Sequence, residues 1–123
     1  MPVARRMNHV HIRVSDLDRS IRFYGAAFGL SEAYRDEEDG EILVFLTTAE
    51  GDVLTLNSAS TGAGTMGGVE HFGFRVPGQL ADCVNAVTEN GGTFLGNAGW
   101  EPDHVAYVRD PDGYVVEIDG RPE

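Results

Sequence analysis

The chain has 123 residues, of which 41% are hydrophobic, a size at which one compact domain buries a core without disulfides. Its 20 acidic and 9 basic side chains give a formal net charge of -11, which repels phosphate backbones and argues against a nucleic-acid partner. The apolar runs are short and no signal-peptide pattern is present, so we expect a soluble cytoplasmic protein without membrane association.

An internal repeat organises the chain. An offset of 62 places residues 8–14 on residues 70–76, with the His, Arg and Val positions matched. The same offset places Gly29 on Gly91, and the strand-like residues 53–56 on residues 115–118. Agreement at one constant offset indicates a duplicated supersecondary unit.

The first unit reads as a strand, a helix and three further strands. Residues 9–14 alternate as in a strand, and residues 15–18 resemble a capping box that opens a helix. One apolar helix face follows, formed by Leu17, Ile21, Tyr24 and Phe28. Gly29 ends this helix, and strands are predicted over residues 31–35, 41–48 and 52–57.

The second unit repeats this pattern, with a strand over residues 69–76, a helix over 80–89 and strands over 93–96, 104–109 and 114–119. Residues 58–68 have the composition of a flexible connector. The predicted fold is therefore α+β: one domain over residues 1–123, in which tandem βαβββ modules (about 8–57 and about 69–119) form curved mixed sheets around a central cleft. Cys83, the single cysteine, is expected in the core.

The repeat predicts a metal site. If the two sheets pair about a pseudo-twofold axis, equivalent strand positions converge, which would bring together His9, Thr55, His71 and Glu117. Two imidazoles and a carboxylate suit Fe(II), Mn(II), Co(II), Ni(II) or Zn(II), and leave open positions where two substrate oxygens can chelate. A lone strand histidine is more often a hydrogen-bonded core residue, but two histidines in one repeat register favour the ligand interpretation.

Two further histidines differ in their expected roles. His11 shares the face of His9 and is a candidate hydrogen-bond partner of the ligands, proton carrier or alternative ligand. His104 differs in parity from Tyr107, so we expect it at the rim or on the surface.

The segments that carry this pattern are Asn-His-Val-His-Ile-Arg-Val-Ser-Asp-Leu-Asp-Arg-Ser-Ile-Arg-Phe-Tyr, Glu-His-Phe-Gly-Phe-Arg-Val and Asp-Pro-Asp-Gly-Tyr-Val-Val-Glu-Ile. Over residues 8–119 the chain resembles the vicinal oxygen chelate superfamily. That superfamily includes glyoxalase I, methylmalonyl-CoA epimerase, extradiol dioxygenases, fosfomycin resistance transferases and bleomycin-binding proteins.

The resemblance implies metal positions at His9, Thr55, His71 and Glu117, and Thr55 stands where glyoxalases and epimerases usually carry Glu or Gln. A threonine hydroxyl performs proton transfer poorly, which argues against both activities. The remaining His, His, Glu set resembles that of extradiol dioxygenases and fosfomycin transferases, and the substrate-orienting tyrosine of the dioxygenases matches Tyr107. A core tyrosine remains an alternative there. The resemblance also implies a homodimer, and the sequence does not decide whether the modules pair within or across subunits.

The function expected from the sequence is an Fe(II)-dependent dioxygenase acting on a small aromatic or polyketide-like molecule chelated through adjacent oxygens. Tyr107 and His11 are its expected catalytic residues, and the expected substrate-binding residues are Phe45, Asp52, Thr55, Asn57 and Trp100. One alternative is a non-catalytic antibiotic-binding protein that stacks its ligand on aromatic side chains such as Phe72. Another is a glyoxalase-type isomerase or lyase in which a water, His11 or Asp52 replaces the group missing at Thr55.

Overall fold

The computed structural model describes residue 3 and residues 5–59, 61–65 and 67–123, apart from the side chain of Glu38. The first module contains β1 (His9–Val14), α1 (Leu17–Phe28), β2 (Ser31–Glu38), β3 (Glu41–Thr47) and β4 (Val53–Ser58). The second contains β5 (Phe72–Arg75), α2 (Leu80–Glu89), β6 (Thr93–Asn97), β7 (Val105–Arg109) and β8 (Val115–Asp119). Residues 60 and 66 of the predicted connector lie outside the described residues.

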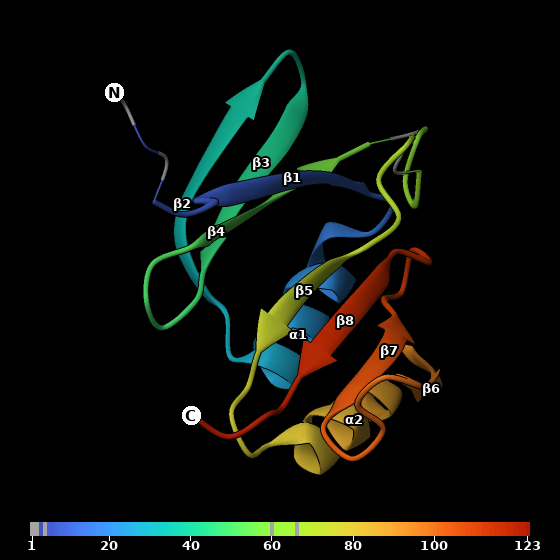
Figure 1. Cartoon of the computed structure of the whole chain (residues 1–123). Coiled ribbons are helices and arrows are strands. Elements are labelled where there is room, and N and C mark those ends of the chain that lie inside the picture. The colour runs from blue at the N-terminus through green and yellow to red at the C-terminus, as the bar shows by residue number, and fades with distance from the viewer. Residues whose placement is uncertain (1–2, 4, 60, 66) are drawn as a thin grey trace.

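Each module forms a four-stranded mixed sheet, with the order β1-β4-β3-β2 in one and β5-β8-β7-β6 in the other (Figure 1). In both sheets the first strand is parallel to its neighbour, and the other pairings are antiparallel. The α+β class and the tandem βαβββ units are confirmed. The strand predicted over residues 69–76 is shorter than expected, so His71 lies just before β5.

Local signals explain where α1 begins and ends. Asp16 is the N-cap, and its carboxylate accepts a hydrogen bond from the Arg19 backbone N–H at 3.1 Å. Gly29 ends the helix with a φ of 71°, a left-handed conformation that glycine adopts without a Cβ penalty. Both boundaries agree with the sequence prediction.

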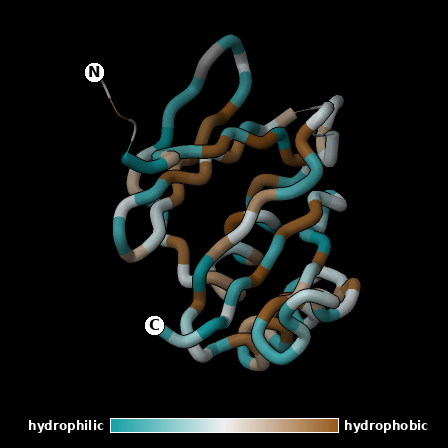
Figure 2. Tube along the Cα trace, viewed as in Figure 1, coloured by the Kyte–Doolittle hydropathy of each residue, from teal (hydrophilic) through white to brown (hydrophobic). Residues whose placement is uncertain are grey.

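One core joins the two modules. The rings of Phe28 in α1 and Phe74 in β5 have centroids 4.5 Å apart, and the buried Tyr24 hydroxyl donates to Asp110 at 2.7 Å. Cys83 of α2 also lies in this core, as predicted, and burial raises the pKa of its thiol to about 12. The buried apolar residues of this core therefore come from both halves of the chain, and hydrophobic stretches can be followed along the trace of both halves in Figure 2.

The histidine-bearing faces of the sheets point away from this shared core. Ile12 and Val14 of β1 are buried in it, whereas the alternating residues His9, His11 and Arg13 are exposed. In the described part of the chain, no helix has the length and apolarity needed to span a membrane.

Candidate metal and substrate site

The second sheet assembles three of the predicted site residues. The Tyr107 hydroxyl donates to Glu117 Oε1 at 3.1 Å, because β7 and β8 place the two residues opposite each other. His71 Nε2 lies 3.7 Å from the same oxygen. The imidazole of His71 meets the Tyr107 ring edge-on, with centroids 5.3 Å apart. His71, Tyr107 and Glu117, here called the β8 cluster, thus share one outward-facing surface.

The β8 cluster fits half of a metal centre. Nitrogen and oxygen ligands of one ion at about 2.1 Å lie about 3.0 to 3.5 Å apart, close to the 3.7 Å between His71 Nε2 and Glu117 Oε1. His71 Nδ1 is a buried atom that makes no hydrogen bond to the described residues, although Glu70 Oε1 lies 3.3 Å away. A small movement of Glu70 would supply the carboxylate partner that metal-bound histidines usually have.

The first sheet carries the equivalent positions. His9 and His11 lie on β1 and Thr55 on β4, where the parallel register pairs His11 with Thr55. Thr55 is buried, and His11 Nε2 lies 3.2 Å from Asn57 Oδ1. His9 Nδ1 lies 2.5 Å from the side-chain oxygen of Asn8. These residues, His9, His11, Thr55 and Asn57, form a second outward-facing group, here called the β1 group.

One chain does not bring the two groups together. No three His, Cys, Asp or Glu side chains within residues 5–59, 61–65 and 67–123 are placed to hold one metal ion. The sequence predicts that His9, Thr55, His71 and Glu117 converge if the two sheets pair, without deciding between pairing within one chain and pairing across subunits. Within one chain the described residues of the two sheets do not pair in this way. The reason is that both sheets use their other faces to build the common core, so the histidine faces diverge.

The β8 cluster differs from the β1 group in having a glycine, Gly73, opposite its carboxylate residue. Gly73 lies opposite Glu117 in the register of β5 and β8, and a Cβ at residue 73 would come within 3.1 Å of the Glu117 Cβ and 3.0 Å of its carbonyl oxygen. In the first module the equivalent pair is His11 and Thr55. Module 2 therefore combines a glycine with a glutamate, whereas module 1 combines a large imidazole with a small hydroxyl side chain.

Of the other predicted substrate-binding residues, Phe45 lies opposite Thr55 in the register of β3 and β4, whereas Asp52 and Trp100 lie outside the β1 group and the β8 cluster. Asp52 forms an ion pair with Arg6 just before β4. Phe45 contacts Tyr34, and Trp100 is exposed on the loop after β6, where the Arg121 guanidinium lies 5.2 Å from its ring centroid. His104 is partly exposed and pairs with Glu101, in line with the rim position expected from its parity.

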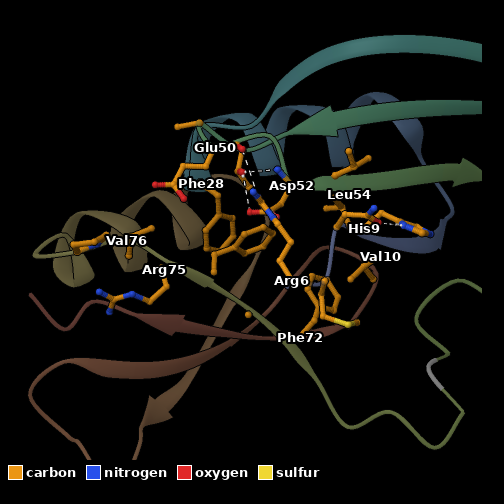
Figure 3. A pocket seen from close by; sticks show the side chains of 18 of the residues that line it. Arg6, His9, Val10, Phe28, Glu50, Asp52, Leu54, Phe72, Arg75 and Val76 are labelled. Carbon is orange, nitrogen blue, oxygen red and sulfur yellow. Dashed lines mark hydrogen bonds and ion pairs between the residues drawn. The ribbon is translucent and has the colours of Figure 1, made fainter. Parts of the chain in front are cut away.

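A cavity of about 970 Å³ opens between the edge strands β1 and β5 (Figure 3). Its aromatic lining comes from Phe28, Phe72 and Phe74, and the Arg6–Asp52 ion pair stands at one side. Of the predicted site residues it includes His9 and Asp52 only. The cavity is therefore not the predicted metal cleft.

An ion-pair cluster that was not predicted from the sequence lies beside the β8 cluster. Arg75 and Arg121 both bind Asp119, at 3.0 Å and 2.8 Å, and they hold the pKa of that carboxyl well below its usual range. The parity shared by Glu117 and Asp119 was a usable signal, because residues two apart in a strand face the same side. Arg121 lies beyond β8, so strand parity does not place it.

Comparison with known proteins identifies the family. The model of the Glyoxalase/Bleomycin resistance protein/Dioxygenase superfamily matches residues 6–118. The chain belongs to this superfamily. It is 33% identical to a probable lactoylglutathione lyase of Vibrio parahaemolyticus, over 92% of the chain and 88% of that protein. A lactoylglutathione lyase of Haemophilus influenzae is 35% identical, over 89% of the chain and 88% of that protein.

The fold agrees with the same family. The trypanothione-dependent glyoxalase I of Leishmania major matches with a TM-score of 0.77 and 28% identity, covering 95% of this chain and 87% of that one. The vicinal oxygen chelate resemblance is thereby confirmed.

The reaction expected from the sequence is wrong. These relatives are lyases rather than oxygenases, which overturns the assignment as a dioxygenase or other oxidoreductase. That assignment gave Thr55 and Tyr107 more weight than the rest of the chain. Members of the superfamily bind divalent metal ions, but the preference for Fe(II) loses its basis together with the oxygenase.

Proposed function

We propose that this protein is a metal-dependent lyase or isomerase of the glyoxalase I type, acting on a small molecule that presents two neighbouring oxygens. The observation that carries the proposal is the β8 cluster, in which His71 Nε2 and Glu117 Oε1 lie 3.7 Å apart and Tyr107 holds the same carboxylate. Its support from relatives is the 33 to 35% identity to lactoylglutathione lyases.

The ligands in this proposal are His9, His71 and Glu117, a nitrogen and oxygen set that suits Zn(II), Ni(II), Co(II) or Mn(II). The ion would polarise the chelated oxygen of the substrate and so acidify the neighbouring C–H group. Tyr107 keeps Glu117 oriented, because its hydroxyl occupies one lone pair of Oε1.

A second copy of the chain completes the centre. The β1 group and the β8 cluster face outward from one core, so neither sheet of a single chain can close over the other's histidine. A symmetric pair, in contrast, places the sheet carrying His9 of each copy against the β8 cluster of the other. The proposed enzyme is therefore a homodimer with two shared sites.

Proton transfer in this proposal falls to His11. Asp52, another of the candidates, is held in an ion pair by Arg6. His11 stands directly across from Thr55, the position where a carboxylate is absent, and its Nε2 is oriented by Asn57 at 3.2 Å. The imidazole would take the proton from the carbon beside the chelated oxygen and return it to the next carbon, which leaves the substrate isomerised without redox change.

The first test combines metal content with turnover. Protein purified without an affinity tag and loaded with Zn(II), Ni(II), Co(II) or Mn(II) should retain about one ion per chain and should isomerise the hemithioacetal of methylglyoxal and glutathione to lactoylglutathione. His71→Ala should remove the metal, whereas His104→Ala, a histidine on the rim, should not. Failure to retain any of these metals, or a metal-loaded protein that leaves the hemithioacetal unchanged, contradicts the proposal.

A further inference from the structure

Two arginines stand beside the β8 cluster on the same face of the sheet. Arg75 and Asp119 are paired in the register of β5 and β8, two residues beyond the pair formed by Gly73 and Glu117 and therefore on the same face of the sheet. Residues two apart along a strand are separated by about 7 Å, so this pair lies within reach of a short substrate bound at Glu117. The pKa of the Arg121 guanidinium is raised, first by its hydrogen bonds and ion pair with Asp119, with smaller contributions from the charges of Glu101 and Glu117.

The arrangement holds both guanidinium groups in fixed positions. Arg121 donates to Asp119 from Nε at 3.0 Å and from Nη2 at 2.8 Å, a bidentate pair. Arg75 uses Nη1 for both Asp119 and the Arg121 carbonyl oxygen, each at 3.0 Å. The Trp100 ring covers the Arg121 guanidinium at 5.2 Å, a cation–π contact. The Asp119 side chain is only 11% exposed, so it serves as an anchor rather than as a surface acid.

The cluster has unused hydrogen-bond donors. Arg75 and Arg121 share Asp119, and the negative charges of Glu101 and Glu117 also act on Arg121, so the feature that distinguishes this place is its oriented, unused donors rather than a net positive charge. Arg75 Nε and Nη2 and Arg121 Nη1 make no hydrogen bond with the described residues, and both side chains are nearly half exposed.

The repeat shows that this cluster belongs to the second module alone. The first-module equivalents of Arg75 and Asp119 are Arg13 and Asn57, and the position equivalent to Arg121 is Ala59. Arg13 instead lies 3.8 Å from Glu41. An ion pair that served the sheet alone would be expected in both modules, whereas the cluster occurs only where a glutamate ligand stands beside it.

We infer that Arg75 and Arg121, fixed by Asp119 and Trp100, form a carboxylate-binding subsite about one strand step from the metal ligands, so that the substrate of this enzyme is an organic acid. The inference rests on the proposed function for the position of the metal. A guanidinium that is already oriented loses little side-chain entropy when it binds a carboxylate, which favours recognition over simple attraction.

Two ligands of equal chain length separate the subsite from the metal. Glutaric monohydroxamate and pentanohydroxamate carry the same bidentate chelating group, and only the first ends in a carboxylate. With Zn(II)-loaded protein in calorimetry, we expect the acid to bind about tenfold more tightly than the neutral ligand, the size of one or two charged hydrogen bonds at a partly exposed site. Trp100 is the single tryptophan, so a change in protein fluorescence with the acid alone reports contact at this place.

Variants assign the difference to these arginines. Arg75→Met with Arg121→Met should abolish the advantage of the acid and leave pentanohydroxamate affinity unchanged, which also shows that the fold and the metal persist. The control Arg22→Met removes one exposed positive charge from α1 and should preserve the tighter binding of the acid. Equal affinity of the two ligands for the wild type, including no binding of either, overturns the inference. Binding of the acid without binding of the neutral ligand supports the subsite and contradicts the chelating metal.

Discussion

Tyr107 donates a hydrogen bond to Glu117 across the adjacent strands β7 and β8, with 3.1 Å between the phenol oxygen and the carboxylate. The equivalent residues in the other module are Phe45 and Thr55, which cannot form such a bond. The Tyr107 hydroxyl therefore orients the Glu117 carboxylate, which distinguishes Tyr107 from an aromatic residue that only packs on the sheet surface.

Tyr107→Phe should weaken metal binding while leaving the fold intact. The ring contact with His71 persists in this variant, but Glu117 loses the donor that orients it. Loss of an outer-shell partner typically costs about 10- to 100-fold in metal affinity. Competition with a chromogenic chelator measures the effect, and Tyr34→Phe, an exposed phenol, is the matched control. Unchanged affinity in Tyr107→Phe would show that the bond does not support a ligand.

A mixture of two inactive chains should recover activity. His9→Ala and Glu117→Ala each remove a ligand, and a heterodimer of the two variants restores one site only if each site draws on both chains. Heterodimers isolated with two different tags should then show about half the wild-type activity per dimer, because one of two symmetric sites is intact. Inactive heterodimers would place the site within one chain.

Substitutions at His11 and at Thr55, the residue opposite it, test the role of His11. His11→Gln should retain metal but lower kcat about 100-fold, the usual contribution of a positioned proton carrier. The double variant His11→Gly with Thr55→Glu copies the pair Gly73 and Glu117 into module 1, and should bind metal more tightly through a fourth ligand. Thr55→Glu alone should gain less metal affinity, because the His11 imidazole occupies the space beside residue 55. Full kcat in His11→Gln would assign proton transfer elsewhere.

The sequence predicted the fold through its offset of 62, since β4 and β8 begin at Val53 and Val115 as the repeat requires. The repeat also grouped His71 with Glu117, and His71 Nε2 lies 3.7 Å from Glu117 Oε1. Strand alternation adds that residues two apart share a face. It could not predict which face of each sheet would build the core, because alternation gives every strand two sides and says nothing about the partner surface. Only the packing of Phe28 on Phe74 resolves that choice.

The missed residues have physical reasons of their own. Arg121 lies after β8, where no periodic pattern assigns a direction. Trp100 is among the predicted substrate-binding residues, but its contact with Arg121 was not predicted, because Trp100 lies on a loop whose path the sequence does not determine. The reaction was wrong for a related reason: a missing ligand at Thr55 was treated as evidence of another chemistry, although His11 stands across from it.

Tyr24→Phe should lower stability without touching the site. The hydroxyl donates to Asp110 at 2.7 Å between α1 and the end of β7, and both groups are buried. Removing a donor to a buried carboxylate costs about 1 to 3 kcal/mol, so the melting temperature should fall by several degrees. Calorimetric melting measures this, with Tyr34→Phe as control, and metal content should remain equal to the wild type. An unchanged melting temperature would contradict a stabilising role for the bond.

Acid should remove part of the stability through Asp119. Its pKa is lowered in the folded state, first by the hydrogen bonds from Arg121, so the folded protein binds fewer protons than the unfolded chain. The contribution is therefore present above the unfolded pKa of about 4 and is lost as the pH falls below it. Arg121→Met should melt earlier than wild type at pH 7, and the difference should shrink below pH 4. A constant difference across this range would argue against the linkage.

The shared core has a consequence for half-length chains. A fragment that ends near residue 57 would keep α1 but lose Phe74 and Asp110, leaving Phe28 and the Tyr24 hydroxyl without their partners. Such a fragment could bury this surface only by associating with another chain, at a rate and extent set by protein concentration. The covalent connection supplies the complementary half at a high effective concentration, so the two halves fold together at any dilution.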